Sequence, residues 1–319
     1  FMATKTNEMT PMRRQYFDIK EQNQDCILFF RLGDFYEMFD EDARVAAKEL
    51  DLTLTTRDRN KPVEEQTPMC GVPYHSVDAY IARLVQKGYK VAICEQVEDP
   101  AQAKGIVQRE ITRIVTPGTV TESCMLEESR NNYIACMFGE DTRIGVAFCD
   151  VSTGAFYVTV CADSQAAASE LGRFAPTEVI RFGQATADEV LNDALRHRLH
   201  CCLDEGKPEQ FIAETAEELL EKHFAKSVAE LGLGGLPEAV IAAGSLLQLL
   251  IELQKNDLSH INELHYYTTG VFMELDLDAR RNLELAETLR AKDKKGTLLW
   301  VLDKTQTPMG GRLLRSWLE

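Results

Sequence analysis

The chain has 319 residues, 45 % hydrophobic and 27 % charged, a balance typical of a folded globular protein with two or three domains. Its formal net charge of −16 argues against a protein that coats nucleic acid through a broad basic surface. No apolar run is long enough to span a bilayer, and the first ten residues lack the order of a secretory signal, so we expect a cytoplasmic protein.

The positions of the cysteines and of the charged residues indicate the state of the thiols and where nucleic acid could bind. The nine cysteines contain no Cys-x-x-Cys pair and most lie inside apolar runs, which indicates reduced core residues rather than a disulfide framework. The formal charge is −3 over residues 1–113, −13 over 114–258 and 0 over 259–319. We therefore expect any nucleic-acid contact in the first or last segment, and we expect salt to weaken it.

Residues 1–113 predict a compact α/β domain. A helix is expected after Thr10-Pro11, because Pro favours the first helical position and Tyr16 belongs to a set of apolar residues at helical spacing. The apolar run over residues 27–30 predicts a buried strand. Gly33-Asp34 then indicates a turn, and we expect residues 31–39 to form a loop-like break around it.

Phe35 and Glu37 stand out within this break. In an extended segment the side chains at positions i and i+2 point the same way, so Phe35 and Glu37 would form one surface while Tyr36 turns away. One interpretation is that Phe35 re-enters the core, as most aromatic side chains do. The other is that it is an outward wedge, because a carboxylate sharing its face is a costly core neighbour when it is unpaired.

The rest of this segment alternates between helix and strand signals. A helix is expected over residues 40–50, a short strand over 51–56 and a strand over 89–97. Between them, Ser76 is expected to cap an amphipathic helix that Gly88 ends. Arg57 and Lys61 lie in a polar loop that is either a solvated tip or a loop that positions a phosphate backbone.

A second domain is expected after a change of pattern near residues 116–119. Three closely spaced strand signals, over 133–138, 144–151 and 155–161, predict an antiparallel meander. Shorter helix and strand signals follow, over 164–174, 178–182, 187–198 and 201–203. Three antiparallel strands followed by βα units are similar to an RNase H-like fold.

Two metal sites compete with a purely structural interpretation of this domain. Asp150, at a strand end, is a candidate carboxylate of a two-metal nuclease, but no further acid on a strand signal accompanies it. A second cluster, with the residue types of a zinc site but without the usual spacing, contains His197, His200, Cys201 and Cys202. We favour structural roles for both groups and expect no metal site.

From residue 214 onward the pattern is helical. Helices are expected over 216–224, 237–255, 283–289 and 298–302. The chain stops at residue 319 without partner elements for the last of them, which suggests a fragment of a longer protein. No Gly-x-x-x-x-Gly-Lys-[Ser/Thr] loop is present, so ATP binding and hydrolysis are not assigned to these residues, and we expect no enzyme activity.

Several blocks of the sequence resemble the MutS family of DNA mismatch repair proteins. Residues 33–39 look like the Phe-x-Glu motif with which that family reads mismatches. Further similar blocks follow in the same order along the chain: Thr67-Pro68-Met69-Cys70-Gly71-Val72-Pro73-Tyr74-His75, Val91-Ala92-Ile93-Cys94-Glu95-Gln96-Val97, Arg113-Ile114-Val115-Thr116-Pro117-Gly118-Thr119 and Thr307-Pro308-Met309-Gly310-Gly311-Arg312-Leu313-Leu314.

The resemblance implies an α/β multi-domain chain with three parts. These are a mixed-sheet mismatch-recognition domain over 1–113, an RNase H-like connector over 114–258 and the beginning of a helical core over 259–319. It implies that Phe35 wedges into a lesion and that Glu37 contacts a mispaired base. Weaker expectations are flanking contacts from Leu32 and Asp34, and backbone contacts from Arg57 and Lys61.

The resemblance also implies partners. These are double-stranded DNA with mismatches or small loops, a MutL-type repair protein at the connector and, for full-length family members, a second copy of the chain. It implies no membrane partner and no cofactor for these residues, since ATP and Mg²⁺ belong to the family's C-terminal ATPase domain. The alternative function is an adaptor whose connector recruits repair partners without itself binding DNA.

Overall fold

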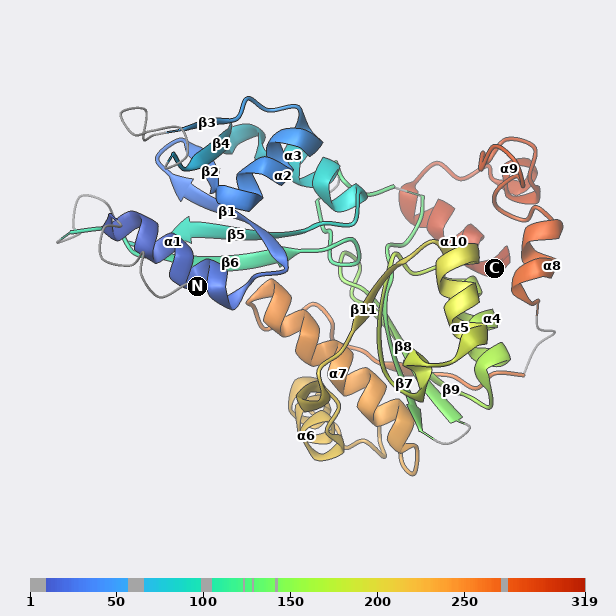
Figure 1. Cartoon of the computed structure of the whole chain (residues 1–319). Coiled ribbons are helices and arrows are strands. Elements are labelled where there is room, and N and C mark those ends of the chain that lie inside the picture. The colour runs from blue at the N-terminus through green and yellow to red at the C-terminus, as the bar shows by residue number, and fades with distance from the viewer. Residues whose placement is uncertain are drawn as a thin grey trace. The chain divides into compact units, whose positions relative to one another are not determined.

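The computed structural model describes residues 10–56, 66–98, 105–122, 124–127, 129–140, 143–270 and 275–318. The chain divides into two compact units, which Figure 1 colours along the sequence. One unit consists of Phe1–Pro117 with Leu253–Lys255, and the other of Gly118–Glu252 with Asn256–Glu319.

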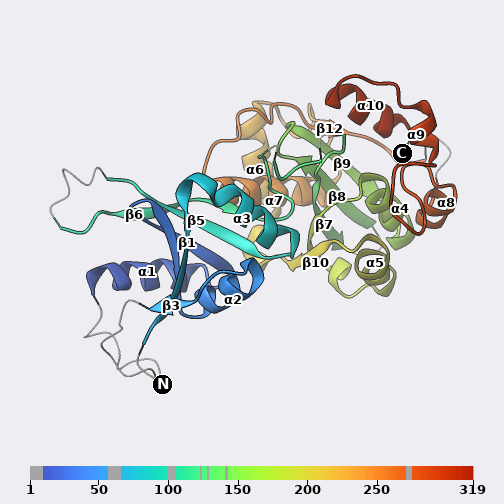
Figure 2. The same cartoon turned by 90° about the horizontal axis from the view of Figure 1, so that it is seen from above.

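The first unit is built on a six-stranded mixed sheet with helices packed against it (Figures 1 and 2). The strand order is β3-β4-β2-β1-β5-β6, in which β1 and β5 are parallel and the other neighbouring pairs are antiparallel. Its elements are α1 (Pro11–Gln22), β1 (Cys26–Leu32), β2 (Phe35–Phe39), α2 (Asp40–Leu50), β3 (Thr55–Thr56), β4 (Pro68–Pro73), the 3-10 turn η2 (Tyr74–Ser76), α3 (Val77–Gln86), β5 (Lys90–Gln96) and β6 (Arg109–Val115).

Local sequence explains where the helices of this unit begin. The Thr10 hydroxyl accepts the Arg13 N–H at 3.4 Å and Pro11 starts α1, as the sequence predicts. Three acids in the first turn of α2 complement the positive end of its dipole. The predicted helix over residues 40–50 is confirmed to the residue.

The core of the first unit lies against both faces of the central strands. Residues 26–30 of β1 are all buried, and so are residues 36–39 of β2. Tyr16 of α1 packs edge-on against Phe30 and Phe39, with ring centres 5.4 Å and 4.9 Å apart, so α1 covers the face of the sheet that these rings share. On β2, Phe39 points to the face that α1 covers, and Tyr36 and Met38 point to the other face of the sheet.

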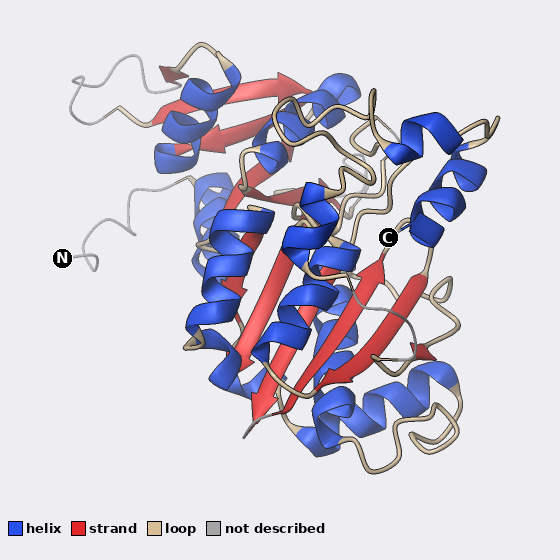
Figure 3. Ribbon diagram, turned by 90° about the vertical axis from the view of Figure 1, so that its right-hand side faces the viewer, coloured by secondary structure: helices blue, strands red, loops and turns tan. Residues whose placement is uncertain are grey.

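The second unit is a sheet covered by helices on both faces (Figure 3). Its strand order is β11-β10-β7-β8-β9-β12, with β7, β8 and β9 antiparallel and β10 and β11 added in parallel. This confirms the predicted meander followed by βα units and the RNase H-like class. β12 adds a further parallel strand beside β9.

The elements of the second unit follow β6 in the chain, and the last two residues of α7 belong to the first unit. They are β7 (Ile134–Glu140), β8 (Arg143–Asp150), β9 (Ala155–Cys161), α4 (Ser164–Phe174), β10 (Glu178–Gly183), η3 (Gln184–Thr186), α5 (Glu189–Asp193), the π-helical η4 (Ala194–Leu199), β11 (Cys202–Glu205), η5 (Pro208–Gln210), α6 (Ala213–Phe224), α7 (Pro237–Gln254), β12 (His265–Tyr266), α8 (Leu277–Asn282), α9 (Leu298–Leu302) and α10 (Pro308–Leu318).

Alternate residues of the central strands of this unit supply two separate cores. Ile134, Cys136 and Phe138 of β7 pack with α6 and α7, whereas Ala135 and Met137 pack with α4 and α5. The α7 layer approaches the sheet very closely. A Cβ placed on Gly145 of β8 would lie 2.0 Å from the carbonyl oxygen of Glu238, so only glycine allows this contact.

Four expectations about local structure are wrong. The region expected to be a loop-like break over 31–39 is a strand hairpin with only Gly33 and Asp34 in the turn. The strand expected over 51–56 is confined to Thr55–Thr56. Ser76 precedes α3 but makes no side-chain cap, because its hydroxyl donates to the Pro73 carbonyl. The helix expected over 187–198 is divided between two short segments of different type, the α-helix α5 and the π-helical η4.

The helix expected over residues 283–289 is also wrong. α8 ends at Asn282, and Glu284 has a φ of +47°, which breaks helical continuation. The carbonyl of Glu284 accepts from Leu298 N–H at 3.3 Å, and that of Leu285 accepts from Leu299 N–H at 2.8 Å. These carbonyls therefore bond the start of α9 instead of a following helical turn. Within the described residues, no helix is long and apolar enough to cross a membrane.

Candidate nucleic-acid interface

One edge of the first sheet brings together the segments singled out from the sequence. β1, β4 and β5 run in the same direction, so their carboxyl ends lie at one edge. The β1–β2 turn lies there, and Tyr74 and Val97 directly follow β4 and β5. Phe35, Tyr74 and Val97 are 47 %, 44 % and 49 % exposed, so this edge presents apolar side chains to solvent.

The turn that carries Phe35 is short and tightly held. Leu32 pairs directly with Phe35, which leaves only Gly33 and Asp34 to reverse the chain. Gly33 has a φ of +60°, a conformation that two-residue hairpins require and glycine adopts without strain. The Asp34 carbonyl accepts the Tyr74 N–H at 3.0 Å, which ties the turn to the end of β4.

Phe35 and Glu37 lie on the same side of β2, because they are two residues apart in a regular strand. Their exposures differ strongly. Phe35 is 47 % exposed, whereas Glu37 is 8 % exposed and lies between its strand neighbours Phe30 and Gly71. Tyr36 is buried on the opposite side. The face shared by Phe35 and Glu37 is thus the expected one, but the carboxylate is set back in the protein.

A charged and aromatic cluster supports the hairpin from the other side of the sheet. The Arg31 guanidinium lies 4.0 Å from the centre of the Tyr74 ring, and its Nη1 is 3.7 Å from Glu95 Oε2. The Tyr36 hydroxyl donates a hydrogen bond to the Glu95 carboxylate. Burial and this bond raise the pKa of Tyr36. The guanidinium of Arg31 therefore interacts with Glu95 and Tyr74, which support the hairpin.

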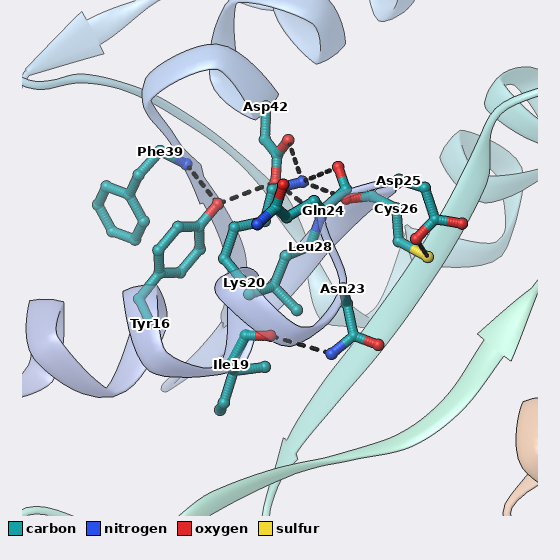
Figure 4. Close-up of polar contacts among 10 residues, drawn as sticks. All are labelled: Tyr16, Ile19, Lys20, Asn23, Gln24, Asp25, Cys26, Leu28, Phe39 and Asp42. Atoms are coloured by element: carbon teal, nitrogen blue, oxygen red, sulfur yellow. Dashed lines mark hydrogen bonds and ion pairs between the residues drawn. The ribbon is translucent and has the colours of Figure 1, made fainter. Parts of the chain in front are cut away.

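A buried carboxylate holds the base of the same hairpin (Figure 4). Asp42 Oδ2 accepts from the Tyr16 hydroxyl at 3.1 Å and from Leu28 N–H at 3.0 Å, and Asp42 Oδ1 lies 2.9 Å from Lys20 Nζ. The Tyr16 hydroxyl in turn accepts from Phe39 N–H at 3.3 Å. Asp42 therefore links α1, β1 and α2 beside the end of β2.

The other predicted contact residues have different placements. Leu32 is half-buried and Asp34 is exposed in the turn. Arg57 and Lys61 lie outside the described residues. Sequence reasoning did not identify Tyr74 as part of this edge. Its position directly after a strand that ends at the same edge as β1 was the available signal, but that depends on knowing the strand order.

Two candidate metal ligands of the second unit, Asp150 and His200, lie within hydrogen-bond distance of other groups of the chain. Asp150 is fully buried, and its carboxylate accepts from Asn132 N–H at 3.2 Å and from the Ser152 N–H at 2.9 Å and hydroxyl at 2.6 Å. His200 Nδ1 lies 3.1 Å from the Arg196 carbonyl at the end of η4. Across the described parts of the chain, no three His, Cys, Asp or Glu side chains are grouped to hold a metal ion.

Three family models match the chain in succession. The model described as MutS domain I matches residues 10–124, MutS domain II matches 132–262 and MutS domain III matches 278–319. The first of these ranges contains the hairpin and its supporting clusters.

Similar full-length proteins carry one shared name. A DNA mismatch repair protein MutS from Ruminiclostridium cellulolyticum is 49 % identical over 98 % of this chain and 36 % of its own length. Proteins of the same name from Acetivibrio thermocellus and Clostridium novyi are each 48 % identical over 98 % of this chain, covering 36 % and 33 % of their own lengths. The chain thus spans about a third of the length of these relatives.

Proposed function

Because the chain belongs to the MutS family of DNA mismatch repair proteins, we propose that it acts in mismatch repair by binding duplex DNA with a mispair or a small loop. The observation that carries this proposal is the ring of Phe35. It is 47 % exposed, although the four residues that follow it in β2 are buried. A two-residue turn and two supporting clusters hold it at the edge of the sheet.

The proposed mechanism starts with insertion of this ring from the minor groove. An apolar wedge between base steps unstacks them and kinks the duplex, at a cost of roughly a few kcal/mol per step. This cost falls where pairing is already weak, so a mispair or unpaired base is selected through its deformability. Phe35 would then stack on one base of the lesion.

Glu37 is proposed to add discrimination from behind the ring. Near phosphates a carboxylate lowers general affinity, but a mispaired base can offer it a ring N–H that has lost its partner. Since Glu37 is only 8 % exposed, a base must come close to the face of β2 to meet it. The carboxylate is therefore proposed to respond to a displaced base rather than to an intact pair.

The proposed contacts around this pair are limited. Leu32 and Asp34 flank Phe35 in the hairpin, and Arg57 and Lys61 are proposed to contact the DNA backbone. The formal charge of −3 over residues 1–113 supports a local contact that depends on shape. We propose no hydrolytic step and no bound cofactor for this recognition, because wedging and hydrogen bonding require neither.

The second unit supports a complementary role in protein binding. Residues 114–258 carry a formal charge of −13, which disfavours contact with phosphates. We propose that this RNase H-like connector recruits a MutL-type repair partner, and that the longer relatives act as homodimers. This adaptor role adds to DNA binding by the first unit and does not replace it.

Titration of paired and mispaired duplexes at low salt tests the proposal. Phe35→Ala is expected to abolish the preference for mispaired DNA, because the wedge is lost. Leu54→Ala is the matched control, since Leu54 is 44 % exposed in the same unit but lies outside the hairpin. It should leave the preference unchanged. An unaltered preference ratio in Phe35→Ala would overturn the wedge mechanism.

A further inference from the structure

The second unit contains a cavity of about 770 Å³ that the proposed DNA contact does not use. Its walls come from the segment before β7, from β9, from the end of α4, from β12 and from α10. Figure 2 shows β12 and α10 next to each other in this unit. The volume lies within the range typical of pockets for small organic ligands.

Four arginines line the cavity: Arg130, Arg173, Arg312 and Arg315. Among the described residues that line it, none is acidic. Arg130 and Arg173 are two of only ten basic side chains over residues 114–258, whose formal charge is −13, and Arg312 and Arg315 come from residues 259–319, whose formal charge is 0. Guanidinium groups match phosphate and carboxylate oxygens with two parallel hydrogen bonds. The lining therefore favours an anion.

Carboxylates outside the lining hold three of these arginines in place. Glu287 Oε1 lies 3.2 Å from Arg130 Nη1 and 3.4 Å from Arg315 Nη2, so one oxygen joins two walls of the cavity. Glu170 Oε2 lies 3.4 Å from Arg173 Nη1. Such pairing fixes the guanidinium positions before a ligand arrives and reduces the entropy lost on binding.

Aromatic rings fill much of the remaining wall. Tyr157, Phe174, Tyr267 and Trp317 all line the cavity. The Arg173 guanidinium lies 5.3 Å from the ring centres of both Phe174 and Tyr267. Rings beside guanidinium groups are the surfaces on which nucleobases stack, because stacking accepts any base and the arginines hold its phosphate.

We propose that this cavity binds a nucleoside phosphate, with its base against the aromatic rings and its phosphate on the arginines. The occupant is a small free nucleotide rather than a nucleic-acid strand, because the cavity volume suits a small ligand and residues 114–258, which supply β9 and the end of α4 to its walls, carry a formal charge of −13. The lining residues belong to the second unit and Phe35 belongs to the first, so this proposal does not depend on the proposed mismatch recognition.

The fluorescence of the 319-residue chain provides a direct test. Trp317 lines the cavity, and Trp300 is the only other tryptophan in the sequence. Titration with AMP is expected to quench the emission saturably, and Trp317→Phe should remove this quenching while calorimetry still detects binding. Adenosine and inorganic phosphate should each bind at least about tenfold more weakly than AMP, because each carries only half of the recognised groups. A tenfold change corresponds to about 1.4 kcal/mol.

Arginine variants locate the binding. Arg312→Gln and Arg173→Gln, on different walls, should each weaken AMP binding at least about tenfold, the loss expected for one charge-assisted hydrogen bond. Arg198→Gln is the control, because Arg198 pairs with Asp193 and Asp278 and does not line the cavity. Far-UV circular dichroism checks that each variant folds.

Three outcomes would overturn the proposal. One is the absence of saturable AMP binding to the unaltered chain. Another is an equal effect of the cavity variants and of Arg198→Gln on the AMP dissociation constant. The third is binding of a single-stranded tetranucleotide but not of AMP, which would identify the cavity as a strand-binding site.

Discussion

Asp42 offers the sharpest test of how the β1–β2 hairpin is held in place. It is 7 % exposed, and Asp42→Ala removes the acceptor of the Tyr16 hydroxyl and of Leu28 N–H. Each donor left unpaired in the interior costs about 1–3 kcal/mol. Lys20 contributes less, because it keeps the Gln24 and Cys26 carbonyls as partners. We therefore expect a loss of about 3 kcal/mol from the free energy of unfolding of the first unit.

Hydrogen exchange measures this loss locally. Amides of β1 should exchange roughly 150-fold faster in Asp42→Ala if they exchange through unfolding of the unit, because about 1.4 kcal/mol corresponds to a factor of ten. Tryptophan fluorescence serves as an internal control, since Trp300 and Trp317 both belong to the second unit and should report an unchanged transition.

Asp51→Asn is the matched control for the loss of a carboxylate. Asp51 pairs with Arg83 at 3.0 Å, but its side chain is 88 % exposed, so the ion pair contributes little to stability. A loss in Asp42→Ala no larger than that in Asp51→Asn would refute the view that the buried carboxylate fixes the base of the hairpin.

Three further predictions concern Glu37, Tyr16 and two of the cysteines. Glu37→Gln should raise affinity for matched duplex in a binding titration, because a negative charge near phosphates is removed; a fall with intact folding would make Glu37 structural. The pKa of Tyr16 is raised by burial, so the unfolded state loses its proton first, and stability should fall above about pH 10 by roughly 1.4 kcal/mol per pH unit. Urea unfolding should show a shallower alkaline decline in Tyr16→Phe, and parallel declines would contradict this. In native labelling with iodoacetamide followed by mass spectrometry, exposed Cys124 should react well before Cys70, whose burial raises its pKa to about 12; equal rates would oppose it.

The sequence predicted helices and strands best where a short run of residues carried a clear local pattern. The helix predicted over residues 40–50 is α2, and the apolar run before Gly33 predicted most of β1. β2 was missed because residues 36–39 are buried on both faces and show no alternation. The failed helix over 283–289 has a tertiary cause, since its carbonyls bond the start of α9.

The candidate site was only partly accessible to the same reasoning. The alternation rule placed Phe35 and Glu37 on one side of the chain, but no local pattern reveals that Glu37 is covered. Asp42 lies among the acids in the first turn of α2, but its partners Tyr16 and Leu28 lie 26 and 14 residues away in sequence. Such partners follow from strand order and packing, which a single sequence does not specify.

The two-residue turn at Gly33 has a thermodynamic consequence for the proposed recognition. A long, slack loop would have to give up many conformations each time its aromatic tip met DNA, whereas this hairpin has already lost them on folding. The free-energy difference between sound and damaged duplex would then come mainly from the DNA itself. In the proposed recognition, the hairpin needs no further ordering at a correctly paired base step, so contact there can be brief. A rigid hairpin of this kind is suited to testing many base steps along a duplex before it stays at one.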